Sequence, residues 1–163
     1  MKRTALMDTQ RLFCTFRVDG RLFGVDILDV KEVTTETTST CIAHAPDEVR
    51  GLVNIRGHIY LALDLRRLLG LPVAGVTGDS RLVLFKPGVG SAFGVIVDEI
   101  GDIQTAEPDR IEAFSRGEHE AAAANLRRVD LIDAVCKLTG ELLMILNPRR
   151  FLAVVEQKLA ARA

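Results

Sequence analysis

The fold of this chain is decided by residues 23–33, FGVDILDVKEV, because the same pattern returns at residues 93–103 as FGVIVDEIGDI. The first three residues of the two segments are identical, and five later pairs keep their chemical type. A second match lies further on, where residues 57–69 (GHIYLALDLRRLL) correspond to residues 140–152 (GELLMILNPRRFL). The offset grows from 70 to 83 positions, so the second copy carries about 13 extra residues between positions 103 and 140. Two copies of one β-rich unit imply a cleft between them and two similar outer surfaces.

Turn and cap residues mark the ends of the expected elements. The pair Asp19-Gly20 separates two alternating runs and predicts a hairpin, because both residues tolerate a positive φ. A further turn is expected near Arg56-Gly57. Asp64 is placed to cap a short helix, and Asn147-Pro148 is typical of the start of a C-terminal helix.

Short strands separated by glycine turns, in two copies, predict a mainly β protein built from two packed β-barrels with short helices. Residues 1–10 show no hydrophobic period and are expected to form a flexible tail. The first barrel is then expected over about residues 11–72 and the second over about residues 80–147. A C-terminal helix is expected over residues 148–161.

The composition narrows the classes of function. Of the 163 residues, 48% are hydrophobic, which is enough for a packed core, and a net charge of −1 offers no basic field for nucleic acid. No apolar stretch is long enough to span a bilayer, and the N-terminus lacks the apolar region of a secretory signal. Cys14, Cys41 and Cys136 are odd in number and far apart. This usage favours a reduced, cytoplasmic setting in which the cysteines act as small buried apolar groups.

The sequence contains no pattern typical of an enzyme or of a metal site. His44, His58 and His119 share no metal-ligand spacing with one another or with a cysteine. No serine lies in a recognisable nucleophile motif, and the glycines of residues 88–94 join two strands instead of opening a helix onto a phosphate. We therefore predict no catalytic activity, no cofactor and no bound metal.

Two charged residues stand out within apolar β-segments. Arg56 lies between strands that otherwise look buried, and Glu32 is flanked by Val30 and Val33. A buried guanidinium needs a partner, so one hypothesis is that Arg56 pairs with Glu32. The alternatives are that Arg56 lies at an exposed turn and that Glu32 is an ordinary solvent-facing strand residue.

Several of these segments, taken in order, resemble CheW, the chemotaxis coupling protein family. The matching parts are the Asp19-Gly20 turn, residues 23–27, residues 30–33, residues 51–57 (GLVNIRG), residues 63–66, residues 93–98 and the strand at residues 142–147. The resemblance covers about residues 10–155, and the NIRG block is its most specific part.

The resemblance implies two five-stranded SH3-like β-barrels packed around a shared hydrophobic core. It also implies a non-enzymatic adaptor that links the cytoplasmic tip of methyl-accepting chemotaxis receptors to the regulatory domain of a CheA-type histidine kinase. The outer faces of the barrels would join the kinase, and the groove between them would receive the receptor. Such a protein would be cytoplasmic, recruited to membrane-associated receptor arrays without inserting into the membrane.

The resemblance also implies roles for particular residues. The receptor-binding groove would contain Val30, Glu32, Val33, Arg56, Val95 and Val97. The structural motif of the family would comprise Asn54, Arg56, Gly57 and Asp64.

The chain departs from the family pattern at a few positions. Leu61 stands where the family usually has proline, and Ala134 and Cys136 replace residues that are often glycine. These changes favour a divergent chemosensory system without threatening the fold. The alternative function is a β-barrel module that binds a small ligand or another protein outside chemotaxis.

Overall fold

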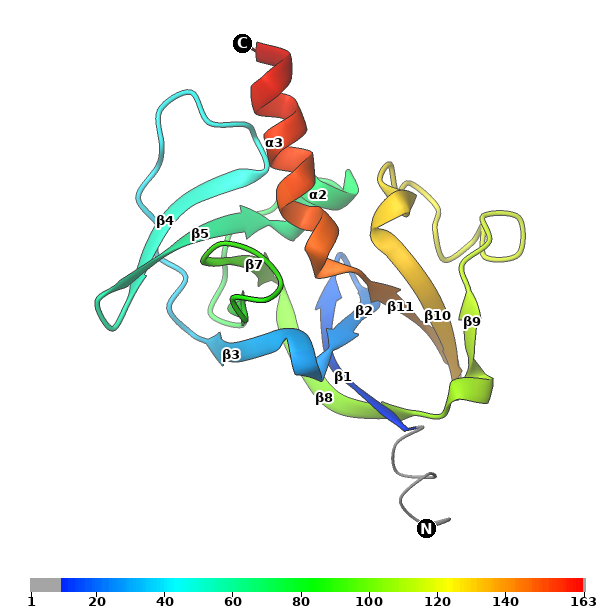
Figure 1. Ribbon diagram of the computed structural model, residues 1–163. Coiled ribbons are helices and arrows are strands. Elements are labelled where there is room, and N and C mark those ends of the chain that lie inside the picture. The colour runs from blue at the N-terminus through cyan, green and yellow to red at the C-terminus, as the bar shows by residue number, and fades with distance from the viewer. Residues whose placement is uncertain (1–9, 163) are drawn as a thin grey trace.

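The computed structural model describes residues 10–162, which form two β-sheets and a C-terminal helix (Figure 1). The predicted tail falls outside the described residues, except for residue 10. The strands are β1 (Arg11–Val18), β2 (Arg21–Asp26), β3 (Val30–Thr34), β4 (Val49–Ile55), β5 (His58–Asp64), β6 (Arg81–Phe85), β7 (Phe93–Val97), β8 (Glu99–Ala106), β9 (Ile111–Ala113), β10 (Ile132–Leu138) and β11 (Glu141–Leu146). The helical elements are η1 (Ile27–Asp29), α2 (Leu65–Leu69), η2 (Pro108–Arg110), η3 (Val129–Leu131), η4 (Pro148–Arg150) and α3 (Phe151–Arg162).

The described strands pair in two sheets, which we call sheet A and sheet B. Sheet A has the order β8-β1-β2-β11-β10-β9, and sheet B has the order β3-β6-β7-β5-β4. The prediction of a mainly β protein with two sheets and a C-terminal helix is confirmed. Sheet A has six strands where five were predicted, because the short strand β9 pairs with β10. The SH3-like character of the two units stays a prediction.

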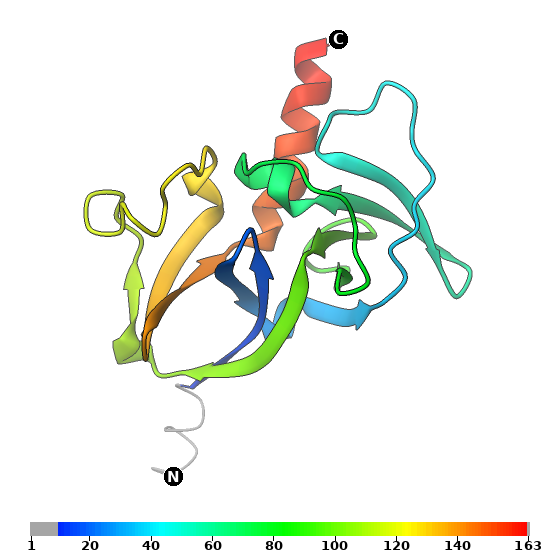
Figure 2. The same ribbon diagram turned by 180° about the vertical axis from the view of Figure 1, so that it is seen from behind.

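Each sheet combines strands from both copies of the repeat. The β1–β2 hairpin of the first copy lies in sheet A beside β8 and β11 of the second copy (Figure 2). The β6–β7 hairpin of the second copy lies in sheet B among β3, β4 and β5 of the first. The boundary placed at residues 72–80 therefore separates the two repeats but not the two sheets. Local sequence patterns predict a hairpin. They do not predict which strand lies beside the hairpin in the sheet, because that strand comes from a distant part of the sequence.

The two exchanged hairpins pair with their neighbours at equivalent positions of the two repeats. In sheet A, β2 runs parallel to β11 with Phe23 opposite Met144, and in sheet B, β7 runs parallel to β5 with Phe93 opposite Leu61. These pairs are related by the two sequence offsets of 70 and 83 positions. A Cβ on Gly94 of β7 would lie 2.5 Å from the backbone oxygen of Val83, so β7 requires glycine at this position.

A hydrophobic core lies where the two sheets meet. It contains Phe16 and Phe23 from sheet A, Phe85 and Phe93 from sheet B, and Phe151 from the start of α3. The rings of Phe85 and Phe93 are 5.1 Å apart between centroids. Figure 1 shows α3 rising between the two sheets, where its buried residues close this core.

The predicted caps and turns are present. Asp19 and Gly20 have φ angles of 53° and 74°, as the predicted hairpin turn requires. The Asp64 side chain accepts hydrogen bonds from the first backbone N–H groups of α2, and the Asn147 side chain caps η4, which leads into α3. The extra residues of the second copy lie between β8 and β10, and include η2, β9 and the loop at residues 114–128.

The cysteine prediction is confirmed in part. Cys14 and Cys136 are buried, and burial raises the pKa of the Cys14 thiol to about 11. Burial also raises the pKa of Cys136. Cys41 is exposed, so the prediction is wrong for this residue. It lies beside the single β-bridge between Thr40 and Leu52, where the chain runs along the outer edge of β4.

Arg66 of α2 joins three segments that are far apart in the sequence. Its Nε and Nη2 atoms donate hydrogen bonds to the two carboxylate oxygens of Asp98 at 3.0 and 2.6 Å. Asp98 also accepts a hydrogen bond from the backbone N–H of Asp19, and Arg66 donates another to the carbonyl oxygen of Pro72. Burial opposes ionisation of Asp98, but the hydrogen bonds from Arg66 and Asp19 outweigh it and lower the pKa of the carboxyl.

Because of this network, we expect part of the free energy of unfolding to be lost at acidic pH. A carboxyl whose pKa is lowered by folding contributes its full stabilisation above its unfolded pKa of about 3.9 and loses it as the pH falls through the folded pKa. Asp98→Asn should lower the free energy of unfolding by about 1–2 kcal/mol at pH 7, a figure reduced for partial exposure, and by less at pH 3. Urea unfolding at both pH values measures this difference. The exposed Asp109→Asn serves as the control, and equal losses at both pH values would contradict the expectation.

Candidate functional site

The predicted pair of misfit charges is present at the edge of sheet B. Arg56 forms an ion pair and a hydrogen bond with Glu32. Glu32 belongs to β3 and Arg56 to the turn after β4, and these strands form opposite edges of sheet B. Lys31 of β3 likewise donates a hydrogen bond to the hydroxyl oxygen of Tyr60 of β5 at 2.9 Å. Sheet B is therefore curled enough for side chains of β3 to reach β5 and the turn after β4.

Arg56 also lies at an exposed turn, so both interpretations of this residue hold. Arg56 and Gly57 have φ angles of 50° and 86°, and the side-chain oxygen of Asn54 accepts a hydrogen bond from the Gly57 N–H at 2.8 Å. The Arg56 side chain is 71% exposed, and that of Glu32 is 26% exposed. Asn54 and Gly57 thus shape the turn, and Arg56 extends from it into solvent.

Because Arg56 is so exposed, its pairing with Glu32 is expected to be weak. A double-mutant cycle with Glu32→Ala and Arg56→Ala should give a coupling energy of at most about 1 kcal/mol, falling further in high salt. Urea unfolding of the four proteins at low and high salt measures it. A coupling of about 3 kcal/mol or more would show that the pair is desolvated, contrary to its exposure.

The valines predicted in the groove divide into two groups. Val33 is 37% exposed and Val30 is half-buried, both on the edge strand β3. Val95 and Val97 have no exposed surface, so the prediction that they line a groove is wrong. All five residues of β7 are buried, because this strand lies between β6 and β5 and is covered on both faces. We use the name β3 surface for Val30, Glu32, Val33 and Arg56.

A second surface, which is apolar and absent from the sequence-based prediction, lies along the edge of sheet A. Ile100 and Ile103 of β8 and Leu12 of β1 are 39%, 54% and 43% exposed. Ile103 lies opposite Cys14 and Ile100 opposite Phe16, so the register places all three apolar side chains on one face. On this face Cys14 and Phe16 are buried in the core, whereas Leu12, Ile100 and Ile103 form an exposed apolar stripe at the edge of the sheet. We call Leu12, Ile100 and Ile103 the β8 surface.

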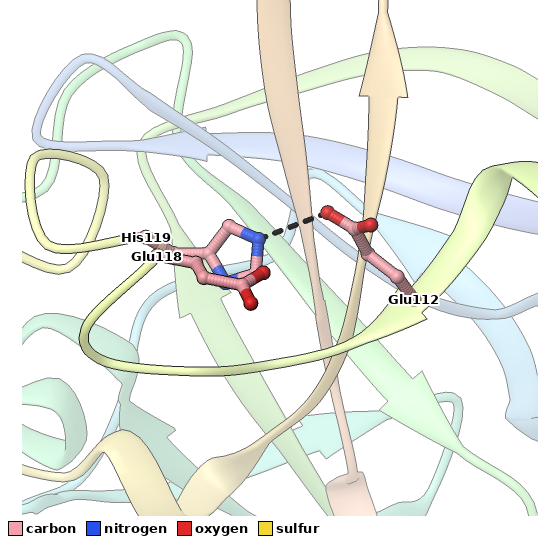
Figure 3. Close-up of side chains that lie close together, drawn as sticks. All are labelled: Glu112, Glu118 and His119. Atoms are coloured by element: carbon pink, nitrogen blue, oxygen red, sulfur yellow. Dashed lines mark hydrogen bonds and ion pairs between the residues drawn. The ribbon is translucent and has the colours of Figure 1, made fainter.

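The loop at residues 114–128 brings His119 close to two carboxylates. The sequence analysis did not predict this group, because it compared the spacing of histidines and cysteines only. The ligand atoms of Glu112, Glu118 and His119 lie within 4.8 Å of one another, and Figure 3 shows the His119 ring directed at Glu112 of β9. Both ring nitrogens are engaged: Nδ1 accepts a hydrogen bond from the Ser115 N–H, and Nε2 lies 3.0 Å from Glu112 Oε1. The hydrogen bond with His119 lowers the pKa of Glu112, as does the charge of Lys137. The geometry is that of a structural histidine which fixes the loop to β9.

Comparison with known proteins identifies the family. Residues 12–156 match the family described as CheW-like domain. The chain belongs to this family. Chemotaxis protein CheW of Bacillus subtilis (strain 168) is 25% identical over 126 residues, which make up 77% of this chain and 80% of that protein. Chemotaxis protein CheW of Rhizobium meliloti (strain 1021) is 34% identical over 103 residues, or 63% of this chain and 65% of that protein.

A solved structure shares the fold. The scaffolding protein TtCheW from Thermoanaerobacter tengcongensis superposes with a TM-score of 0.70 at 24% sequence identity, covering 83% of this chain and 88% of that chain. This likeness shows that the two chains share one fold over most of their length. Among residues 10–162, no helix is both long and apolar enough to cross a membrane.

Proposed function

We propose that this protein is a non-enzymatic adaptor that couples methyl-accepting chemotaxis receptors to a CheA-type histidine kinase. Membership of the CheW-like family supports a role in chemotaxis, because relatives bear the names chemotaxis protein CheW and scaffolding protein. In this proposal the protein works in the cytoplasm and is recruited to membrane-associated receptor arrays.

The observation that carries the proposal is the presence of two exposed surfaces on different sheets, one mixed apolar and charged and the other apolar. The β3 surface lies on an edge of sheet B, and the β8 surface lies on an edge of sheet A. An adaptor has to hold two partners at once, so it needs two sites that do not overlap. We assign the receptor tip to the β3 surface, in keeping with the family resemblance, and the regulatory domain of the kinase to the β8 surface.

Each contact can be individually weak. Exposed stripes of three or four side chains are small compared with the interfaces of stable complexes, so micromolar affinities are expected for isolated partners. An array of receptors and kinases raises the effective concentration of every partner and makes the whole assembly stable. Weak separate contacts are thus compatible with a stable signalling complex.

The test is co-purification of the tagged protein with a CheA-type kinase and with chemotaxis receptors from a lysate of the source organism, identified by mass spectrometry. Recovery of both partners, and loss of the kinase when the β8 surface is disrupted, would support the proposal. A protein folded as described here that captures neither partner would contradict it and favour a binding module outside chemotaxis.

A further inference from the structure

A polar pocket of about 750 Å³ opens on a part of the molecule that neither proposed surface uses. It lies between the segment that follows α2, the loop at residues 114–128 and α3. Its lining includes four cationic side chains and three acidic ones, those of Arg67, Arg116, Arg127, Lys158, Asp19, Asp47 and Glu48. Arg67 pairs with Asp47 and Lys158 with Glu48. The volume falls in the range of small-molecule sites, and the charged lining suits a hydrophilic ligand.

The pocket is lined by the buried carboxylate of Glu48, which the fold does not require at this position. Glu48 is only 5% exposed, and its equivalent in the second copy, 83 positions later, is the fully buried Leu131. Both residues hold the same backbone place: the Glu48 carbonyl accepts a hydrogen bond from the Asp64 N–H at 2.8 Å, and the Leu131 carbonyl accepts one from the Asn147 N–H at 2.9 Å. Since leucine satisfies the same structural position, the carboxylate of Glu48 calls for another explanation.

The hydrogen-bonding capacity of Glu48 is only half used. Its Oε2 atom lies 2.5 Å from the Lys158 ammonium of α3. Its Oε1 atom is buried and has no hydrogen-bond partner among the described residues. A buried acceptor without a partner is unfavourable, and rotation of the Glu48 carboxylate toward the pocket would let a hydroxyl or amino group of a ligand satisfy it.

The arginines offer the complementary chemistry. The side chains of Arg116 and Arg127 make no ion pair or hydrogen bond within residues 10–162, although both line the pocket. The stem of Arg127 packs directly on the backbone of Gly70, where a Cβ would lie 2.7 Å from it, and its N–H donates to the Leu69 carbonyl. Arg127 is therefore held in place at the pocket while its guanidinium stays available. Planar guanidinium groups are well suited to bind phosphate.

We propose that this pocket binds a phosphorylated sugar or polyol. The phosphate contacts Arg116 and Arg127, and a sugar hydroxyl donates a hydrogen bond to Glu48 Oε1. The described residues that line the pocket include no aromatic side chain, so nothing there would stack on a nucleobase, which favours a sugar phosphate over a nucleotide.

Calorimetric titration of the purified full chain tests this proposal independently of any chemotaxis partner. The probes are fructose 1,6-bisphosphate and glucose 6-phosphate, with inorganic phosphate, fructose and ATP for comparison. We expect saturable binding of at least one sugar phosphate, tighter than that of inorganic phosphate or ATP. Arg116→Gln combined with Arg127→Gln should weaken it by about tenfold or more, while Arg110→Gln, which removes an exposed charge elsewhere, should leave it unchanged.

Glu48→Leu gives the sharper test, because Leu131 shows that leucine is accepted at the equivalent place. This variant should fold normally by circular dichroism and bind the sugar phosphate about tenfold more weakly, with little change for inorganic phosphate. No saturable binding of either sugar phosphate up to about 10 mM would overturn the proposal. So would equal losses in Arg110→Gln, unchanged binding in Glu48→Leu, or binding of ATP as tight as that of the sugar phosphates.

Discussion

Replacing Gly51 by alanine is expected to lower the free energy of unfolding by about 3–5 kcal/mol. Gly51 has a φ of 144°, and a Cβ there would lie 2.2 Å from the carbonyl oxygen of Thr40. That oxygen cannot simply move, because it accepts a hydrogen bond from the Leu52 N–H at 2.9 Å while the Thr40 N–H donates to Leu52 at 2.8 Å. Alanine therefore has to break this bridge or bend β4. Urea unfolding of the variant measures the loss.

Gly75→Ala is the matched control for this experiment. A Cβ at Gly75 meets no atom within 4 Å and its φ is not in the left-handed region, so the change should stay within about 0.5 kcal/mol. A loss of less than about 1 kcal/mol in Gly51→Ala would show that the segment around Thr40 yields easily and that the bridge contributes little.

Charge introduced on the β8 surface is expected to separate kinase binding from receptor binding. Ile103→Asp places an unpaired carboxylate in the middle of the apolar stripe and should weaken kinase binding by about a hundredfold, as the loss of a hot spot does. Binding to a receptor-tip peptide should change little. Val33→Asp on the β3 surface should give the reverse pattern. Surface plasmon resonance with purified kinase regulatory domain and receptor tip measures both affinities.

The control for both variants is Val76→Asp, which alters an exposed valine outside the two surfaces. Val97→Asp cannot serve in this experiment, because Val97 has no exposed surface and a carboxylate there would unfold the protein. If Ile103→Asp and Val33→Asp, both folded, lose kinase and receptor binding in equal measure, a single shared site replaces the two surfaces.

Turns and helix caps could be predicted from the sequence, because they depend on residues that are close together in the chain. The Asp19-Gly20 turn and the Asp64 cap each follow from residue types at short spacing, and both are confirmed. The internal repeat follows from two matching segments at offsets of 70 and 83 positions, and the equivalent β2–β11 and β7–β5 pairings agree with it. The exchange of hairpins between sheets was not predicted, because an apolar run such as that of residues 93–97 indicates a buried strand but not which strand lies beside it. Val95 and Val97 were assigned to the groove from the family resemblance, whereas the apolar run itself favours burial.

The candidate site was predictable where a residue conflicts with its own surroundings. Glu32 and Arg56 are charged residues in apolar segments, and their pairing was proposed on that ground and is confirmed. Ile100 and Ile103 give no such conflict, since isoleucine in a strand fits a buried position equally well. Their exposure results from the place of β8 at the edge of sheet A, which only the complete strand order reveals.

The exchange of hairpins limits how this molecule can move. The chain crosses from sheet A to sheet B after β2 and returns after β7, so each sheet is tied to the other by strands at its centre. The two repeats could separate only if the β2–β11 and β7–β5 junctions broke, and the two sheets could swing apart only by opening the core that they share. Binding at the β3 surface can therefore affect binding at the β8 surface only through rotation of the whole molecule or through small changes of packing in the shared core. In the proposed function, a rigid molecule of this kind would hold its two partners at a fixed distance and orientation.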